Sequence, residues 1–377
     1  MKRTIALFTT TRAEFGILAS FIRKVQEDSS LNSFLFVGGT HLKKEFGHTI
    51  DEINNSGFKV TDTFDYLDQI EDSPYNLTKS SGKCMEQLAE IFKKYSFDYT
   101  CILGDRYELI PIVQSSILFN VPIIHFRGVE ITEGAIDNKI RHMVTQASDI
   151  HLTAADTYSQ FLVNMGIPKE DICTVGSLAV ETMKNVAPID KESLFKDLNL
   201  DLNKETIMMT YHPVTVKGEY TQLQQIENIF KVLLDYDFQI VITAPNLEAE
   251  REIIIDYINK QVEQNENMHL FNSLGMKRYH SMISYCSFII GNSSSGIFEV
   301  PFYKKPTVNI GDRQKGRYLH PSIIQTDNST LSIKQGIEKA KSAEYLSEIK
   351  DMKYQFGEGN SSELALQFIK NKLLDLC

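Results

Sequence analysis

The feature that most constrains the fold is an end-to-end alternation of short apolar runs with amphipathic helical patterns. Short apolar runs without polar alternation are typical of strands that are buried on both faces. Examples are IALF at 5–8, TCIL at 100–103 and SFII at 287–290. Strands that alternate with helices form parallel sheets with right-handed crossovers and a helical layer on each face. The pattern therefore predicts an α/β fold built from parallel sheets.

The expected strands fall into two series. The first comprises Thr4–Phe8, Phe34–Val37, Tyr99–Leu103, Val121–His125, Ile150–Thr153 and Ile172–Val175. The second comprises Ile207–Thr210, Gln239–Thr243, His269–Phe271, Phe288–Ile290, Thr307–Ile310 and Ile323–Gln325. Apolar residues at helical spacing predict helices between them, for example over Phe15–Gln26, Cys84–Tyr95 and Tyr158–Met165.

The length of the chain predicts two domains, because 377 residues exceed the usual size of one hydrophobic core. A break falls at about 177–206, where a proline and a charge run occur without a strong strand signal. We expect one Rossmann-like domain over residues 1–177 and a second over 178–360. The helical pattern within 361–377 is expected to pack back on the first domain.

Composition excludes several classes of protein. A formal charge of −10 argues against an extended nucleic-acid surface, which needs a basic footprint. The five cysteines are scattered and form no CxxC pair, as expected for reduced thiols in a cytosolic protein. No apolar run approaches the length of about 20 residues that spans a membrane. We expect a cytoplasmic protein without a nucleic-acid or membrane partner.

The stretch GNSSSGIFEVP at 291–301 predicts a phosphate-binding turn. It lies between an apolar run and a helical pattern, so free backbone N–H groups and the helix dipole point to one place. Ser294 and Ser295 add hydroxyl donors, and Gly296 is expected to let a phosphate approach the backbone. A second strand–turn–helix pattern, TTTRAEFG near the N-terminus, offers Arg12. The two half-sites indicate a nucleotide diphosphate held between two domains.

The serine loop alone is equally compatible with an ordinary turn, because it lacks the Lys-Ser/Thr ending of a P-loop. A basic run, GDRQKGR at 311–317, follows another expected strand and supplies Arg313. Such a run is usually a solvated turn. Its position beside the serine loop in topological order favours a contact with phosphate.

Polar clusters follow three expected strands directly, where ligands bind in parallel sheets. The clusters are GDRYE, FRGVEITEGAIDNKIRH and YHPVT. Their candidate residues are Asp105, Arg106, Glu108, Arg127, Glu130, Thr132, Glu133, Asp137, Arg141, His142 and His212. Carboxylates gathered in a cleft can acquire different proton affinities, as general acid–base catalysis requires.

Several of these residues have an equally simple structural interpretation. Asp105 stands at a strand–helix junction, where an aspartate often caps the helix. Arg106 and Glu108 are compatible with surface charges on a first helical turn. Asp137 and Arg141 are four residues apart and are compatible with an ion pair along one helix.

The histidines give no metal signature. His125 ends an apolar strand and is expected to be structural, whereas His212 precedes a proline and fits either a packed loop or proton transfer. The nine histidines show no HxxxH or HExxH spacing, so no metal site is expected. GxSxG is absent as well, which argues against a serine nucleophile.

Six motifs occur together in one order: TTTRAEFG, GGTHLKKEFGHT, GDRYE, EITEGAIDNKIRH, YHPVT and GNSSSGIFE. With this set the chain resembles, over nearly its whole length, the hydrolysing UDP-N-acetylglucosamine 2-epimerases of bacterial sialic acid biosynthesis. The resemblance implies the two-domain glycosyltransferase B fold, with the UDP-sugar in the interdomain cleft. It also implies a homodimer that needs no cofactor.

The resemblance further implies a reaction and the residues that perform it. UDP leaves C1 as a proton leaves C2, and water adds to the resulting glycal to give N-acetylmannosamine. The residues matching the family's acid/base positions are Asp105, Glu130, Asp137 and His212. Those expected to bind the substrate are Arg12, Arg127, Thr132, Arg141, His142, Asn246, Asn292, Ser293, Ser294, Ser295, Gly296, Glu299 and Arg313, with Glu299 accepting hydrogen bonds from ribose.

One departure from the family pattern concerns the sugar. Many members read His-x-Glu-Gly-Gly-Glu where this chain has Arg127 in place of the first glutamate. Arginine stays protonated and cannot transfer a proton, so either another acid such as Glu133 serves, or the substrate differs. Relatives with a TEGA-x-D run include enzymes of the legionaminic acid route, which act on a UDP-linked 2,4-diacetamido-2,4,6-trideoxy sugar. The motifs are also compatible with a glycosyltransferase, a non-hydrolysing epimerase or an inactive UDP-sugar-binding protein.

Overall fold

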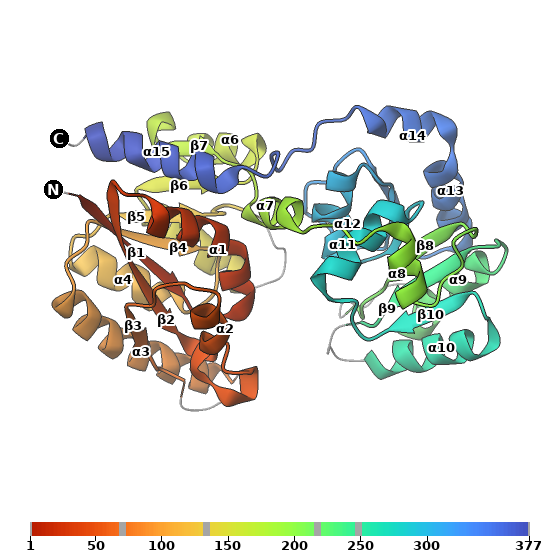
Figure 1. Cartoon of the computed structure of the whole chain (residues 1–377), viewed down its shortest axis with the longest axis horizontal. Helices are drawn as coiled ribbons and strands as arrows, with labels where there is room; N and C mark the ends of the chain where they lie inside the picture. The colour runs from red at the N-terminus through yellow and green to blue at the C-terminus, as the bar shows by residue number, and fades with distance from the viewer. Residues whose placement is uncertain (1, 68–72, 131–135, 215–219, 246–250, 376–377) are drawn as a thin grey trace. The chain divides into compact units, whose positions relative to one another are not determined.

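The computed structural model describes residues 2–67, 73–130, 136–214, 220–245 and 251–375. The chain divides into two compact units, coloured along the sequence in Figure 1. Unit 1 comprises Met1–Thr182 and Gln355–Cys377, and unit 2 comprises Met183–Tyr354. Each unit contains one parallel sheet with helices on both faces, which confirms the predicted α/β class.

Unit 1 is built on a seven-stranded sheet in the order β3-β2-β1-β4-β5-β6-β7, and every pairing is parallel. The strands are β1 Arg3–Thr9, β2 Leu31–Gly38, β3 Asp62–Phe64, β4 Tyr99–Leu103, β5 Ile123–Phe126, β6 Ile150–Thr153 and β7 Ile172–Thr174. Strand order reverses between β1 and β4. In open α/β sheets, ligands bind beyond the carboxyl ends of the strands at such a reversal.

The helices of unit 1 connect these strands. They are α1 Arg12–Glu27, α2 Ile50–Asn55, α3 Pro74–Lys94, α4 Leu109–Leu118, α5 Ile136–Gln146 and α6 Asp156–Asn164, with short 3₁₀ turns at Gly39–Leu42, Lys44–Phe46 and Lys169–Asp171. Helix α7, Leu178–Asn185, contains the point where the units divide, and α15, Ser361–Asp375, is the last helix of the chain. None of the helices in the described part of the chain is both long and apolar enough to cross a membrane.

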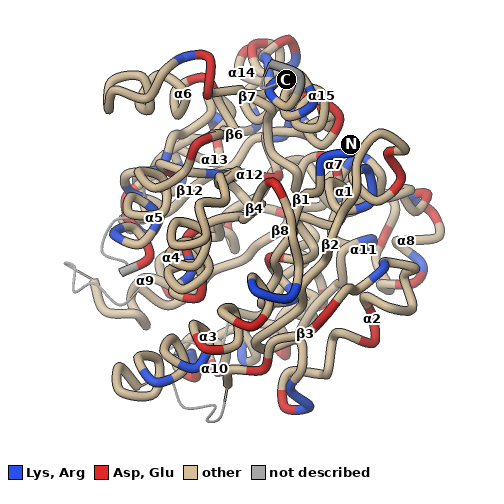
Figure 2. Tube along the Cα trace, turned by 90° about the vertical axis from the view of Figure 1, so that its left-hand side faces the viewer, with Lys and Arg blue, Asp and Glu red and all other residues tan. Residues whose placement is uncertain are grey.

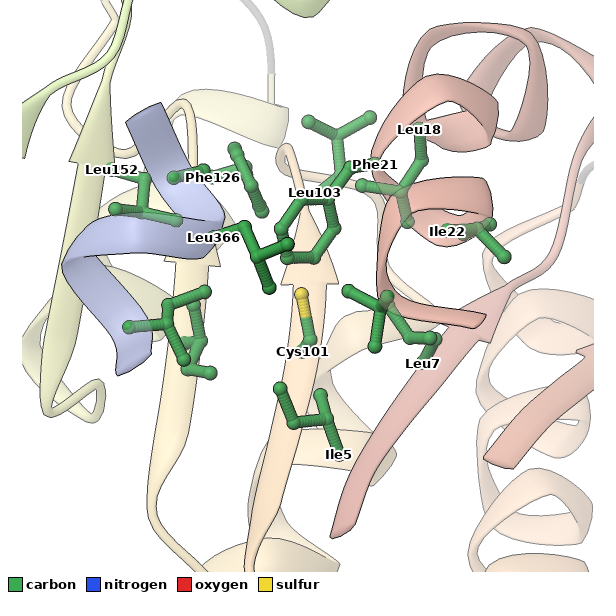
Figure 3. Packing of buried hydrophobic residues seen from close by; sticks show 14 of the residues in the cluster. Ile5, Leu7, Leu18, Phe21, Ile22, Cys101, Leu103, Phe126, Leu152 and Leu366 are labelled. Carbon is green, nitrogen blue, oxygen red and sulfur yellow. The ribbon is translucent and has the colours of Figure 1, made fainter. Parts of the chain in front are cut away.

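Side chains of unit 1 alternate between two cores, because successive strand residues point to opposite faces. Ile5, Leu7 and Cys101 face a core that α1 and α15 cover. In Figure 3, Leu366 of α15 lies beside Leu103 in this core. Ala6, Phe8 and Ile102 face the opposite core, to which α3, α4 and α5 contribute.

Unit 2 contains a six-stranded sheet in the order β10-β9-β8-β11-β12-β13, again with parallel pairings throughout. Its strands are β8 Thr206–Thr210, β9 Gln239–Thr243, β10 Met268–Phe271, β11 Ile289–Gly291, β12 Thr307–Ile310 and β13 Ile323–Thr326. Its helices are α8 Lys191–Asp197, α9 Gln222–Leu233, α10 Arg251–Gln264, α11 Gly275–Tyr285, α12 Ser294–Phe298, α13 Thr330–Lys341 and α14 Ala343–Lys350, with a 3₁₀ turn at Val300–Tyr303. Here strand order reverses between β8 and β11.

Candidate active site

Asp105 and Arg141 meet at the carboxyl end of the unit 1 sheet. Asp105 follows β4, while Arg141 projects from α5, and the Nη2 of Arg141 donates to the Oδ2 of Asp105. Arg141 is 6% exposed, so this charge pair is largely removed from water. Asp137 lies one turn earlier on α5 and is half-buried. Arg141 therefore ties α5 to the end of β4 and does not serve only as a partner along its own helix.

Arg127 and Glu130 form a second pair, directly after β5. The Nε of Arg127 lies 2.8 Å from Oε1 of Glu130, and its Nη2 lies 2.5 Å from Oε2. Glu130 is 6% exposed, and a buried carboxylate requires such a partner. Arg127 and Val129 adopt positive φ values of 61° and 59°, a conformation that costs on the order of 1–3 kcal/mol each. Arg127 thus holds the carboxylate of Glu130 in place.

His125 supports the loop that carries Asp105. Its Nε2 donates to the carbonyl of Gly104 at 2.8 Å, and its Nδ1 is 3.4 Å from Oγ1 of Thr145. Burial lowers the pKa of His125 to about 4, so the ring is neutral at pH 7. His125 is therefore a structural residue of this loop.

Glu108 is not the surface charge that its sequence position allows, whereas the Arg106 side chain is exposed as that interpretation predicts. Glu108 is 1% exposed, and two hydrogen bonds of 2.8 and 3.2 Å join it to the guanidinium of Arg106. A neighbouring carboxyl, Glu14 of α1, accepts from the N–H and hydroxyl of Thr10 at 2.8 and 3.0 Å. Burial raises the pKa of Glu14 to about 7. Sequence reasoning missed Glu14, because TTTRAEFG shows its charge but not its burial.

A cavity of about 370 Å³ opens at the carboxyl ends of β1, β2 and β4. Three cationic side chains line it, from Arg12, Lys43 and Arg106, beside apolar groups that include Leu67 and Leu77. The Arg12 side chain is 74% exposed, and its 3.3 Å contact with a glutamate on α2 is a weak surface pair. The cavity can therefore accept an anionic or polar ligand with an apolar side.

Asn292 fastens β8 to β11 where the order of the unit 2 sheet reverses. Its Oδ1 accepts from the N–H of His212 at 2.7 Å, and its Nδ2 donates to the carbonyl of His212 at 2.9 Å. Asn292 is fully buried, so its side chain holds the backbone of His212 instead of facing a ligand. Gly291 has φ 138°, and a Cβ there would lie 1.9 Å from the carbonyl of Thr210. Only glycine fits at this position between the paired strands β8 and β11.

The serine loop continues from this point into α12. Ser293 caps α12 by accepting from the N–H of Ser295 at 3.4 Å, and the hydroxyl of Tyr279 donates to Ser295 at 2.7 Å. Ser295 is buried, whereas the neighbouring Ser294 is exposed. Ser294 is therefore the hydroxyl of this loop that is presented to solvent.

Gly296 has a packing role that its sequence position does not indicate. Its N–H donates to the carbonyl of Ser293, and a Cβ would lie 2.8 Å from Cγ2 of Thr307 on β12. The absent side chain makes room for α12 to pack on β12. The approach of a phosphate to the Gly296 backbone stays a prediction.

Glu299, which follows α12, lies close to His280 of α11: 3.7 Å separates Oε2 of Glu299 from Nε2 of His280. Burial raises the pKa of the Glu299 carboxyl and lowers the pKa of His280 to about 4. At pH 7 the imidazole is neutral, so this contact is not a full ion pair. Glu299 remains one-third exposed and can accept hydrogen bonds from a ligand.

The basic run after β12 reaches the serine loop. The Nη1 of Arg313 is 3.4 Å from the carbonyl of Asn292, and the Nε2 of Gln314 donates to the same oxygen at 2.7 Å. The sequence predicts Arg313 in this position but gives no indication of Gln314. The uncharged amide of Gln314 does not stand out among the basic residues of this run.

The remaining candidate residues take no part in the contacts described above. Thr132 and Asn246, like the alternative acid Glu133, lie outside the described residues. The ring of His142 lies beside Phe161 of α6, with 6.2 Å between centroids. Within the described ranges, no three His, Cys, Asp or Glu side chains are grouped so as to hold a metal ion.

The chain matches a family model and several known proteins. A family model described as UDP-N-acetylglucosamine 2-epimerase matches residues 23–370. A GDP/UDP-N,N'-diacetylbacillosamine 2-epimerase (hydrolyzing) of Campylobacter jejuni is 34% identical over 91% of this chain and 89% of its own length. The polysialic acid biosynthesis protein P7 of Escherichia coli is 28% identical over 98% of this chain and 94% of its own length.

A solved structure shares the fold at low sequence identity. The crystal structure of UDP-GlcNAc 2-epimerase from Neisseria meningitidis bound to UDP-GlcNAc aligns with a TM-score of 0.78 and 16% identity. The alignment covers 98% of this chain and all of the other.

Proposed function

Because this chain belongs to the UDP-N-acetylglucosamine 2-epimerase family, we propose that it is a hydrolysing UDP-sugar 2-epimerase. The proposed reaction converts UDP-N-acetylglucosamine and water into free N-acetylmannosamine and UDP, for sialic acid biosynthesis in the cytoplasm. The observation that carries the proposal is the pairing of two carboxylates with two arginines at the ends of β4 and β5. Such pairs fix the orientation of acid and base groups toward a substrate.

The proposed chemistry has two steps. In the first, a carboxylate takes the C2 proton while the C1–O bond to UDP breaks, which leaves a double bond between C1 and C2. In the second, water adds its oxygen to C1 and gives up one proton to a carboxylate base, while an acid delivers a proton to the opposite face of C2. Asp105, Glu130 and Asp137 are the proposed acids and bases, and His212 is the proposed fourth member. Arg127 and Arg141 are positioning residues in this scheme.

The leaving group is assigned to the serine loop of unit 2. The exposed hydroxyl of Ser294 and the cation of Arg313 support this assignment, because a diphosphate would gain hydrogen bonds and charge compensation from them. Glu299 is proposed to accept from ribose hydroxyls. Donors that stabilise departing UDP act in the transition state, so their loss lowers kcat as well as affinity.

A second substrate is favoured by one similarity and one feature of the cavity. The relative at 34% identity is named for a diacetylated bacillosamine, a 2,4-diacetamido-2,4,6-trideoxy sugar. The cavity beside Arg12 contains Phe46, Leu67 and Leu77, which suit a methyl or acetamido group better than a hydroxyl. The alternative proposal is the same hydrolytic epimerisation on the UDP-linked diacetamido sugar, on the legionaminic acid route.

Proton NMR in deuterated water separates these proposals. The protein is incubated with UDP-N-acetylglucosamine and, in a parallel sample, with the UDP-diacetamido sugar. We expect free 2-epimerised sugar with deuterium at C2, together with stoichiometric UDP. The ratio of kcat/KM for the two substrates identifies the physiological one.

Three different outcomes would contradict the proposal. An intact epimerised UDP-sugar indicates a non-hydrolysing epimerase, and UDP release only with an added sugar acceptor indicates a transferase. Binding of UDP without any turnover indicates a binding protein. Asp105→Asn should abolish turnover while UDP affinity changes by no more than a few-fold, because the carboxylate is assigned to proton transfer and not to UDP.

A further inference from the structure

His280 is a buried histidine to which the proposed chemistry gives no role. It lies on α11 and is 8% exposed. Its ring stacks on the ring of Tyr303, with 5.9 Å between centroids, and meets the ring of Tyr279 edge-on at 5.8 Å. Its Nδ1 has no hydrogen-bond partner in the described part of the chain. A buried polar atom without a partner costs stability, so an imidazole at this position calls for an explanation.

The burial of Nδ1 determines where the ring carries its proton. Burial lowers the pKa of His280 to about 4, so the imidazole is neutral at pH 7, and a neutral imidazole has a single N–H. A proton on Nδ1 would be a buried donor without an acceptor. A proton on Nε2 instead faces the carboxyl of Glu299, whose Oε2 lies 3.7 Å away. The neutral ring therefore presents an N–H donor to Glu299.

The donor that α11 presents to Glu299 is not a cation. The charged residues of α11, Lys277 and Arg278, are the third and fourth of the helix, and α12 has no charged residue. Figure 2, which marks the charged residues along the chain, labels both helices. Arg278 pairs with Asp197 at 2.8 Å. A lysine or arginine beside Glu299 would form a salt bridge and compete with a ligand for the carboxylate oxygens. An imidazole N–H can orient the carboxylate and leave its charge available.

Such a donor also opposes the effect of burial on Glu299. Burial raises the pKa of this carboxyl because it disfavours the charged form, whereas a hydrogen bond to the Ser295 side chain lowers it. The hydroxyl of Ser295 accepts from Tyr279 at 2.7 Å, so its own proton can be donated to the carboxylate. Tyr279 and His280 are consecutive residues of α11. One acts on Glu299 through Ser295, and the other faces it directly.

We propose that His280 is a positioning residue, whose Nε2–H holds the Glu299 carboxylate in the orientation that accepts hydrogen bonds from the ribose of a nucleotide. This inference rests on the proposed function, which assigns Glu299 to ribose. The separation of 3.7 Å exceeds hydrogen-bond range by roughly 0.5–1 Å. Contacts of this kind commonly tighten when a ligand binds.

The proposed role concerns discrimination between sugars. A site built to hydrogen-bond a hydroxyl group rejects an analogue without that hydroxyl, because its polar groups are then left unpaired. His280 should therefore determine how strongly the site distinguishes ribose from a sugar without hydroxyls. Contacts with the diphosphate, which are assigned to the serine loop, should be unaffected.

Titration calorimetry with UDP and with 2′,3′-dideoxy-UDP tests this role. We expect the wild type to bind UDP at least ten-fold more tightly than the dideoxy nucleotide. His280→Leu, which has a similar volume and no polar atom, should reduce this preference to less than three-fold and leave the affinity for the dideoxy nucleotide unchanged. The matched control is His269→Leu on the edge strand β10, which should keep the full preference. A full preference in His280→Leu, or no preference in the wild type, would overturn the proposal.

Further variants separate positioning from packing. His280→Gln, whose amide can present an N–H to Glu299, should retain most of the preference. His280→Phe keeps a ring against Tyr303 and should lose the preference as His280→Leu does. Glu299→Ala should abolish the preference, and adding His280→Leu should have no further effect on it, because His280 acts through Glu299. A normal preference in His280→Phe, or additive losses in the double variant, would refute the positioning role.

UDP release from a UDP-sugar distinguishes failure of this inference from failure of the proposed function. A wild type that prefers UDP ten-fold but releases none from a UDP-sugar contradicts the epimerase and supports the role of His280. A wild type that releases UDP, with an unchanged preference in His280→Leu, contradicts only the role of His280.

Discussion

At the scale of single residues, the main feature of the unit 1 site is the pairing of its carboxylates with arginines. Asp105 and Glu130 each meet an arginine, and each pair lies at the end of a strand of the unit 1 sheet. The pairing is the basis on which Arg127 is proposed as a positioning residue. It also gives each carboxylate a fixed orientation before a substrate arrives.

We expect Arg127→Gln to lower both activity and stability. It leaves Glu130 buried without its charge partner, a change that costs about 3–5 kcal/mol at buried pairs. The partly exposed position of Arg127 reduces this cost, so we expect about 2 kcal/mol. The measurements are kcat for UDP release and urea unfolding by circular dichroism. The control is Arg278→Gln, which removes an exposed ion pair with Asp197. It should change kcat by no more than a few-fold and the free energy of unfolding by no more than about 0.5 kcal/mol.

Glu14 gives unit 1 a distinct pH dependence. Its pKa is about 7 in the folded protein, against an ordinary value of 4.5. Between pH 4.5 and 7 the folded protein therefore keeps a proton on Glu14 that the unfolded chain has lost. The contribution of Glu14 to stability is therefore full below about pH 4.5 and is lost as pH rises toward 7. The folded carboxyl remains neutral through most of this window.

We expect Glu14→Gln to gain stability relative to the wild type as pH rises. The amide oxygen can accept both bonds from Thr10 but cannot ionise, so the difference should grow by about 2–3 kcal/mol between pH 5 and 8. Urea midpoints at four pH values measure it. Glu27→Gln, at an exposed position of α1, should show a constant difference. A constant difference for Glu14→Gln as well would refute the raised pKa.

The sequence predicts which residues stand at strand ends, but not how they pair. Asp105 and Arg141 are both candidates, since polar residues that follow strands are visible in the chain. Their partnership depends on the packing of α5 beside β4, which no local spacing encodes. Likewise, the burial of Glu14 and the contact between Tyr279 and Ser295 arise from tertiary packing alone.

At the scale of elements, each sheet presents polar loops where its strand order reverses. The carboxyl ends of the paired strands β8 and β11 form the more tightly packed of these places, because Gly291 approaches the carbonyl of Thr210 and Asn292 fastens the backbone of His212. The loop geometry of unit 2 therefore depends on one glycine and one buried amide. Its serine loop begins directly after them.

We expect Gly291→Ala to weaken UDP binding and destabilise unit 2. A methyl group cannot fit 1.9 Å from a carbonyl oxygen, so β8 and β11 must separate locally, at a cost of about 3 kcal/mol or more. The opposite result is expected for Gly16→Ala in α1, where the Cβ meets nothing and stability should rise by about 0.5–1 kcal/mol. Calorimetry of UDP binding and thermal unfolding test both variants. Normal UDP affinity in Gly291→Ala would show that the close pairing of β8 and β11 at Gly291 does not shape the nucleotide site.

Most strands are predictable because buried parallel strands are continuous apolar runs. Runs such as TCIL give β4 its predicted bounds of Tyr99–Leu103. The exception is β3, whose three residues Asp62–Phe64 include a carboxylate and only one fully buried side chain. An edge strand so short has no periodicity to read. Its position is fixed by pairing with β2 and not by its own composition.

At the scale of the whole molecule, the first unit is completed by the last helix. Helix α15 buries Leu366 and Ile369 against α1 and the sheet. Ion pairs of 2.6 and 2.7 Å also link Glu363 and Lys370 to α1 and the turn that follows it. The terminal helical pattern is legible in the sequence, whereas these partners, more than 300 positions away, are not.

We expect Ile369→Ala to destabilise unit 1 by about 2–4 kcal/mol, the usual cost of a cavity at a fully buried aliphatic side chain. Leu364→Ala, on the same helix but 36% exposed, should cost less than about 1 kcal/mol. Thermal unfolding by circular dichroism compares the two. Equal effects would mean that α15 contributes little to the core of unit 1.

Because α15 is the last helix of the chain, unit 1 cannot complete its folding until translation is nearly finished. Residues 183–354 are translated before the helix that completes the core of unit 1. While unit 2 is synthesised, Leu103, Phe126 and Leu152 of the nascent N-terminal sheet therefore remain incompletely covered. During that interval the apolar face of unit 1 is open to chaperones. Pausing or truncation late in translation should thus expose the first unit to aggregation before the second.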